Sequence, residues 1–110
     1  NKKVYGFKDC EPDVISLLPQ LFELSENIMI KASPLVDIKM GVDELKYVKS
    51  VHIVSLNNDC KELLFILKKN QQDSPSIYSI NLESKQNQYK FFLTHVKGKL
   101  KSMEWEPSLY

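Results

Sequence analysis

The chain has 110 residues, of which 43% are hydrophobic and 26% are charged, and its formal net charge at pH 7 is +1. These values are ordinary for one globular domain or part of one, and so small a charge gives no argument by itself for nucleic-acid binding. No apolar run approaches the ~20 residues of a membrane span, and no signal peptide opens the chain.

The first predicted element is a helix over residues 9–24. Asp9 or Glu11 can serve as its N-cap, and Pro12 sits where the first turn tolerates proline. Pro19 interrupts the helical spacing of the apolar residues, because a proline inside a helix removes a hydrogen bond and clashes with the preceding turn. We therefore expect either a kink or two short helices that meet at Pro19.

A strand and a second helix follow. The strand covers residues 27–32, and its unbroken apolar centre, Ile28 to Ile30, predicts burial on both faces. The helix covers residues 34–46, with Ser33 as its N-cap and Pro34 in its first turn. One apolar stripe marks the buried side of this helix: Leu35, Ile38, Val42 and Leu45.

Two further strands are predicted at residues 50–56 and 62–68, joined by a short loop of turn-forming residues. They should pair as an antiparallel hairpin. Strand, helix and strand over about 30 residues form a βαβ unit, so the strand at 27–32 should run parallel to the one at 50–56. Another hairpin is predicted from strands at 77–82 and 89–94, and the tail from residue 96 onward has no clear period.

This order of elements matches the second half of the class I S-adenosylmethionine-dependent methyltransferase fold, a Rossmann-like α/β sheet. In that fold the seventh strand is inserted antiparallel between the fifth and sixth, which gives the order 5-7-6. The stretches DCEPDVISLLPQL, IKASPLVDI and VHIVSLNNDCKELLFIL resemble a group of THUMP-like RNA methyltransferases found largely in the Bacteroidetes. The resemblance covers about residues 4 to 68. It implies that residues 1–69 are the C-terminal half of a methyltransferase-like domain, and that residues 70–110 form a hairpin and tail leading to a following domain.

The cofactor-binding features of such folds are missing from this chain. A glycine turn after the first strand and an acidic residue about 20 positions later hold the nucleotide, and neither occurs here. The DPAR-type motif that precedes "DCEPD" in the resembling proteins is also missing, and both ends look cut. We therefore expect a fragment that neither binds S-adenosylmethionine nor transfers methyl groups alone. The resemblance implies that the longer parent transfers a methyl group from this cofactor to a nucleophilic nitrogen, and that its substrate is RNA.

The corner after the first strand is the candidate ligand site, because open α/β sheets bind ligands beyond the carboxyl ends of their strands. There Lys31 could offer a cation to phosphate or base, and Ser33, beside Pro34, a hydroxyl at a helix start. Asp37 could contact substrate. The structural alternative is that Ser33 caps, Pro34 starts the helix, Lys31 reaches to water and Asp37 complements the helix dipole.

The remaining candidates favour structural roles. His52 lies in an apolar strand with no acidic or thiol neighbour in sequence, so we interpret it as a structural histidine facing the covering layer. The two cysteines, Cys10 and Cys60, lack metal-site spacing and fit a reducing cytoplasm. Asn57, Asn58 and Asp59 are turn formers rather than a calcium loop. The lysines at 97, 99 and 101, followed by Trp105, are a weak signal for RNA and are better explained as a solvated face.

Two functions remain open at this stage. The first is part of a cytoplasmic methyltransferase that acts on RNA. The second is a non-catalytic α/β module that mediates protein association, since the strand at 27–32 should have an unpaired apolar edge that favours a homodimer or an exchanged element.

Overall fold

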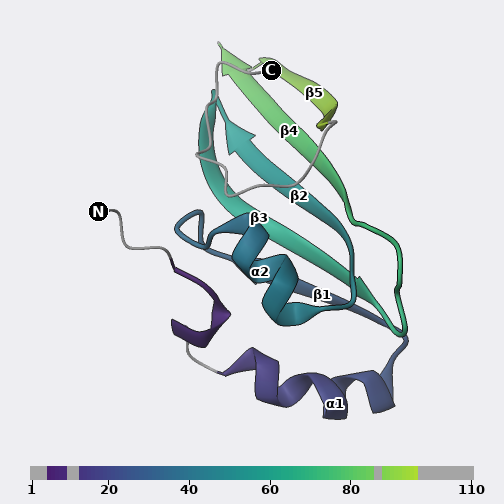
Figure 1. The fold of residues 1–110 in the computed structure, drawn as a ribbon. Helices are drawn as coiled ribbons and strands as arrows, with labels where there is room; N and C mark the ends of the chain where they lie inside the picture. The colour runs from purple at the N-terminus through teal and green to yellow at the C-terminus, as the bar shows by residue number, and fades with distance from the viewer. Residues whose placement is uncertain (1–4, 10–12, 86–87, 97–110) are drawn as a thin grey trace.

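The structure is a computed structural model, and it describes residues 5–9, 13–85 and 88–96. Its elements are η1 (Phe7–Asp9), α1 (Val14–Leu24), β1 (Asn27–Ala32), α2 (Ile38–Leu45), β2 (Val48–Leu56), β3 (Asp59–Lys68), β4 (Ser76–Lys85) and β5 (Gln88–Val96). The five strands form one sheet, to which the helices add a single layer (Figure 1).

The strand order in the sheet is β1-β3-β2-β4-β5. β3 lies between β1 and β2 and is antiparallel to both, with Phe65 opposite Ile30 on one side and Val51 on the other. β1 and β2 are therefore parallel, and the predicted insertion of an antiparallel strand between them is confirmed. The fold is α/β, as expected for part of a Rossmann-like methyltransferase sheet.

The second hairpin extends the same sheet. β4 pairs in parallel with β2, for instance Val51 with Ile77, and β5 pairs antiparallel with β4. The hairpin itself was predicted, but its attachment to β2 was not. The division into residues 1–69 and 70–110, with a following domain, stays a prediction.

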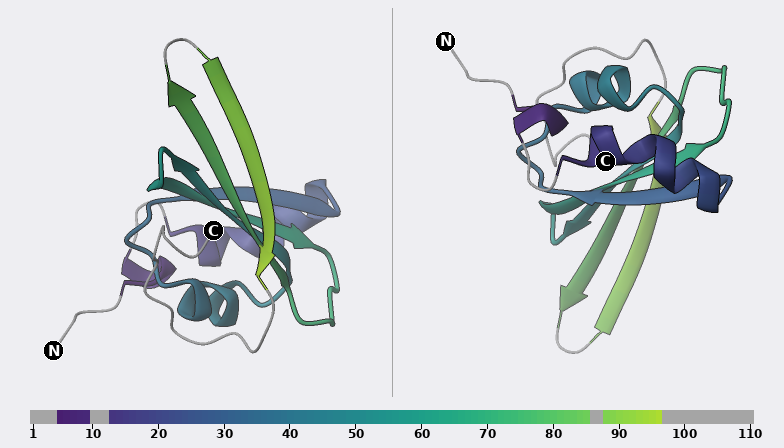
Figure 2. Two further views of the ribbon diagram at one scale, coloured as in Figure 1. Left: turned by 90° about the horizontal axis from the view of Figure 1, so that it is seen from above. Right: turned by 90° about the horizontal axis from the view of Figure 1, so that it is seen from below.

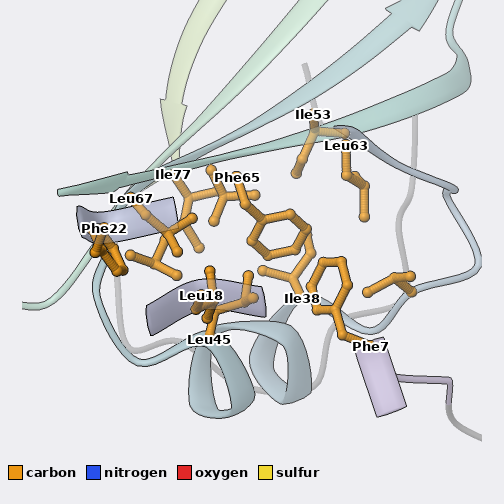
Figure 3. Close-up of a cluster of buried hydrophobic side chains, with 13 residues drawn as sticks. Phe7, Leu18, Phe22, Ile38, Leu45, Ile53, Leu63, Phe65, Leu67 and Ile77 are labelled. Carbon is orange, nitrogen blue, oxygen red and sulfur yellow. The ribbon is translucent and has the colours of Figure 1, made fainter. Parts of the chain in front are cut away.

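All three helical elements lie on one face of the sheet, as the views from above and below show (Figure 2). The core fills the space between this helical layer and the strands, with Phe65 at its centre and Phe7, Leu18 and Leu45 facing it from the helices (Figure 3). The rings of Phe7 and Phe65 pack edge to face with their centroids 5.1 Å apart. Burying such aromatic and aliphatic side chains is the main favourable term in folding.

The expectation that β1 is buried on both faces is wrong. Its exposure alternates along the strand, and Met29 is 65% exposed. Ile28 and Ile30 pack against the core, whereas Met29 alternates with them along the strand and is exposed on the opposite face. No described helix covers that face (Figure 2). An unbroken apolar run does not reveal by itself which of its two faces will be left uncovered.

Both helices begin later than predicted. Asp13, not Asp9 or Glu11, caps α1, because its side chain accepts a hydrogen bond from the backbone N–H of Ser16 at 3.4 Å. Glu11 and Pro12 lie outside the described residues. Pro19 lies inside α1, which is one continuous helix, so the alternative of two short helices is wrong. α2 begins at Ile38, four residues later than predicted, after a turn that forms part of the candidate site.

Candidate functional site

β1, β2 and β4 are parallel to one another, so their carboxyl ends lie together and form what we call the carboxyl edge of the sheet. Ligands of open α/β sheets bind at this edge. Three segments meet the solvent there: the corner from Lys31 to Asp37, the tight turn at Asn57 and Asn58, and the end of β4.

Lys31 is the last residue but one of β1 and lies on the face away from the helices. Its side chain is 72% exposed, and its Nζ lies 3.9 Å from Oε2 of Glu62 on the neighbouring strand. An exposed ion pair at that distance contributes little, typically about 0–1 kcal/mol. The ammonium group is therefore held loosely and stays accessible to an anion.

Ser33 and Pro34 form a turn rather than the start of a helix, so the prediction that Ser33 caps α2 is wrong. The Ser33 hydroxyl accepts a hydrogen bond from the N–H of Leu35 at 3.1 Å, and its carbonyl accepts one from Val36 at 3.1 Å. Val36 forms a bridge with Tyr5, which ties the corner to the N-terminal segment. This bridge holds residues 33–36 in a turn and postpones the helix.

Asp37 is the N-cap of α2. Its carboxylate accepts a hydrogen bond from the N–H of Met40 at 2.9 Å, and its own N–H donates to the carbonyl of Tyr5 at 2.7 Å. A capping carboxylate satisfies one of the free N–H groups at the helix start and favours its dipole. The structural interpretation of Asp37 therefore has direct support, although Asp37 also lines an open groove of about 710 Å³ together with Lys8 and Lys39.

The turn between β2 and β3 is docked onto β4 at the same edge. Asn57 and Asn58 both have positive φ, 50° and 65°, as a tight hairpin turn requires. The backbone N–H of Asn58 donates to Oδ1 of Asn81 at 2.9 Å, and Nδ2 of Asn81 donates to Oδ1 of Asn58 at 2.9 Å. Asn81 is 3% exposed, so this reciprocal pair fixes the edge without offering free groups to a ligand.

Sequence reasoning missed Asn81. Asparagine is depleted in strands, so an asparagine within the apolar alternation of β4 was the one signal that could have identified it. Its partner is 23 residues away in sequence, and nothing local reveals that pairing.

Burial shifts the pKa of two titratable groups in the strands, His52 and Cys60. Burial lowers the pKa of His52, whose ring stacks on Tyr78 with centroids 5.1 Å apart and lies 3.2 Å from the Ser50 hydroxyl. Since Val51 and Ile53 point to the core, His52 lies on the opposite face, so the prediction that it faces the covering layer is wrong. Burial raises the pKa of the Cys60 thiol, which keeps it protonated and unreactive.

The described residues do not fit a nucleotide cofactor or a metal ion. A Cβ at Gly6 would collide with the carboxylate of Glu44, and Gly41 lies inside α2 with the rings of Phe7 and Phe65 about 3.0 Å from such an atom. Neither glycine therefore offers open backbone to a pyrophosphate. Within the described ranges no three His, Cys, Asp or Glu side chains come together as a metal site.

The chain matches no protein-family model and no curated protein. It is similar to a solved structure, the "Crystal structure of putative methyltransferase from Porphyromonas gingivalis W83", with 32% sequence identity and a TM-score of 0.66. The match covers 81% of this chain and 23% of that one. This chain resembles part of a methyltransferase.

The likeness supports the methyltransferase-like fold that the strand order indicates. The matched region spans less than a quarter of the similar protein, so the activity of a whole protein does not follow from it. Among the helices of the described residues, none is both long and apolar enough to cross a bilayer.

Proposed function

We propose that this chain is the C-terminal half of the methyltransferase domain of a longer, S-adenosylmethionine-dependent RNA methyltransferase of the THUMP-like group, acting in the cytoplasm. The observation that carries the proposal is the antiparallel strand β3 between the parallel strands β1 and β2. The likeness to the "putative methyltransferase" of Porphyromonas gingivalis W83 adds support at the level of sequence and fold.

In this proposal the cofactor belongs to the longer parent. The described residues do not fit it, so no step of methyl transfer is assigned to this chain. This chain contributes half of the sheet, including the carboxyl ends of β1, β2 and β4, beside which the substrate would lie. Holding a substrate in the right position accelerates its reaction.

The substrate-proximal segment in this proposal is the corner of Lys31, Ser33, Pro34 and Asp37. Lys31 is its most accessible charge, because among the described residues only Glu62 pairs with it, at 3.9 Å. A lysine so placed can contact an RNA phosphate as a point charge. In the parent, Lys31→Ala should weaken RNA binding and reduce its salt dependence. Lys61→Ala removes a lysine at the start of β3 that is already paired with Asp59, and it should leave both unchanged. Equal effects of the two substitutions would remove Lys31 from the substrate side.

Calorimetry with S-adenosylmethionine tests the proposed function. The full-length parent should bind the cofactor, and these 110 residues alone should not. A parent that fails to bind would refute the methyltransferase assignment. Binding by the isolated chain would show that its own residues form a cofactor site, although Gly6 and Gly41 offer no open backbone to a pyrophosphate.

The second candidate, an α/β module for protein association, is favoured by the free edge of β1. Among the described residues β1 pairs only with β3, so its other edge exposes backbone N–H and C=O groups. An antiparallel pairing of two copies centred on Met29 would place Ile28 opposite Ile30 and Lys31 opposite Asn27, with no like charges face to face. Light scattering over a concentration series should then show a dimer, and a strict monomer at high concentration would exclude this candidate.

A further inference from the structure

An apolar groove lies where β2 begins and β3 ends, at the end of the sheet opposite to the carboxyl edge. It has a volume of about 410 Å³, within the range of small-molecule sites, about 300–1,000 Å³. α1 forms one wall with Ile15, Pro19 and Phe22, and Tyr47, just before β2, lines the groove as well. The rings of Phe22 and Tyr47 pack edge to face with centroids 5.7 Å apart, so part of the lining is aromatic.

Backbone hydrogen bonds hold the segments around this groove together. The N–H of Lys68 donates to the carbonyl of Tyr47 at 3.0 Å, which joins the end of β3 to the residue before β2. The N–H of Lys69 donates to the carbonyl of Glu26 at 2.8 Å, which joins the end of β3 to the segment after α1. Because these segments are fixed before a ligand arrives, little conformational entropy is lost on binding.

The rim of the groove is positively charged. Lys46 and Lys69 both line it and are both exposed, and neither side chain has an ion pair within the described part of the chain. Glu44 also lines the groove, but its carboxylate accepts hydrogen bonds from the N–H groups of Phe7 at 2.6 Å and Lys8 at 3.3 Å. The two ammonium groups are therefore the charges available to a ligand.

Beneath the rim the groove is lined by buried aliphatic side chains. Leu18 and Leu45 are only 7% and 1% exposed. A ligand that rests against them gains by removing apolar surface from water. Contact with the rings of Phe22 and Tyr47 favours an aromatic body over an aliphatic one. At about 410 Å³ the groove suits a compact ring system rather than a long chain.

Charge complementarity decides the rest of the ligand. Two unpaired lysines beside an apolar surface favour an anionic group and disfavour a cationic one. We propose that the groove binds a small aromatic carboxylate, with its ring against the pair of Phe22 and Tyr47 and its carboxylate at the rim formed by Lys46 and Lys69. This site lies away from the carboxyl edge, and the proposal does not depend on the proposed function.

Titration of the 110-residue chain with 2-naphthylacetate, followed through its amide resonances, tests the proposal. The acid should shift the amides of Phe22, Tyr47 and Asn70 until they saturate. The dissociation constant should be about 1 mM or lower, as expected for a ligand of about 14 non-hydrogen atoms. 2-Naphthylethylamine, which has the same rings and a positive charge, should bind about tenfold more weakly or not at all. Equal binding of the acid and the amine, or no saturable shift with the acid, would overturn the proposal.

Paired substitutions locate the carboxylate. Lys46→Gln combined with Lys69→Gln should weaken the binding of 2-naphthylacetate about fivefold, and circular dichroism checks that the variant is folded. The control, Lys61→Gln combined with Lys85→Gln, removes the same two charges at the opposite end of the sheet and should leave the affinity unchanged. Equal weakening by both pairs, or shifts confined to another surface, would overturn the proposal. The same shifts on concentrating the chain without the acid would mean that a second copy fills the groove, and would also overturn it.

Discussion

Ser55 and Ser79 form a matched pair for measuring the contribution of a buried hydroxyl. They lie on the core side of neighbouring parallel strands and are 1% and 2% exposed. The Ser55 hydroxyl is hydrogen-bonded to the thiol of Cys60, whereas the Ser79 hydroxyl has no partner among the described residues. Ser55→Ala should therefore lower the free energy of unfolding by about 1 kcal/mol, while Ser79→Ala should be neutral or stabilising. Urea denaturation of the two variants checks this, and equal losses would mean that Ser79 has a partner.

His52 makes the stability of the fold depend on pH. Burial lowers the pKa of His52 from its ordinary value of 6.5, so the unfolded chain takes up this proton at a higher pH than the folded one. The neutral form therefore stabilises the fold above pH 6.5, and this contribution is lost as the pH falls toward the folded pKa. The melting temperature of His52→Gln should fall less between pH 7 and about 5 than that of the parent sequence. His95→Gln, at the exposed end of the same aromatic stack, is the control, and an equal flattening there would contradict the assignment to His52.

At the scale of elements, Gly41 shows why α2 accepts a poor helix former. Replacing a helical glycine by alanine normally stabilises by about 1 kcal/mol. Here the added Cβ would lie 3.0 Å from ring carbons of Phe7 and Phe65, both fully or nearly buried. Overpacking of that kind costs about 1–3 kcal/mol, so Gly41→Ala should destabilise the chain in urea denaturation. The same substitution in a Phe7→Leu background should lose this penalty, and a Gly41→Ala protein more stable than the parent sequence would refute the packing argument.

The Asn58–Asn81 pair is expected to hold the second hairpin onto β2. Asn81→Asp replaces the amide donor to Asn58 by a carboxylate oxygen and buries a charge, which should cost about 1–3 kcal/mol or more. Asn27→Asp makes the same change at an exposed strand end and should be nearly neutral. Hydrogen exchange should show the β4 amides less protected in Asn81→Asp alone. Unchanged protection would mean that the strand pairing suffices without the amide pair.

Sequence patterns predicted the elements better than their ends. The strand at residues 27–32 was predicted with its observed bounds, because turn formers flank a short apolar run. The starts of both helices were wrong, because several residues of equal capping chemistry compete at each one. Asp13 prevails over Asp9 and Glu11, and Asp37 over Ser33. For α2 the choice depends on a hydrogen bond to Tyr5, more than 30 residues away in sequence, which no local pattern contains.

At the scale of the whole molecule, the strand order was predictable and the coverage of the sheet was not. A right-handed βαβ crossover leaves room for one strand between its parallel partners, and the short loop after β2 supplies it. The pairing of β4 with β2 and the single helical layer depend on long-range packing. The candidate site shares this limit: Lys31 was identified from sequence, but its partner Glu62 is on another strand.

Nuclear Overhauser contacts between backbone protons of the three strands test the central claim, that β3 separates β1 from β2. The account predicts cross-strand contacts between Ile30 and Phe65 and between Phe65 and Val51, with none directly joining β1 to β2. Direct contacts between β1 and β2, or helical contacts within residues 27–32, would contradict the strand order and with it the likeness to a methyltransferase sheet.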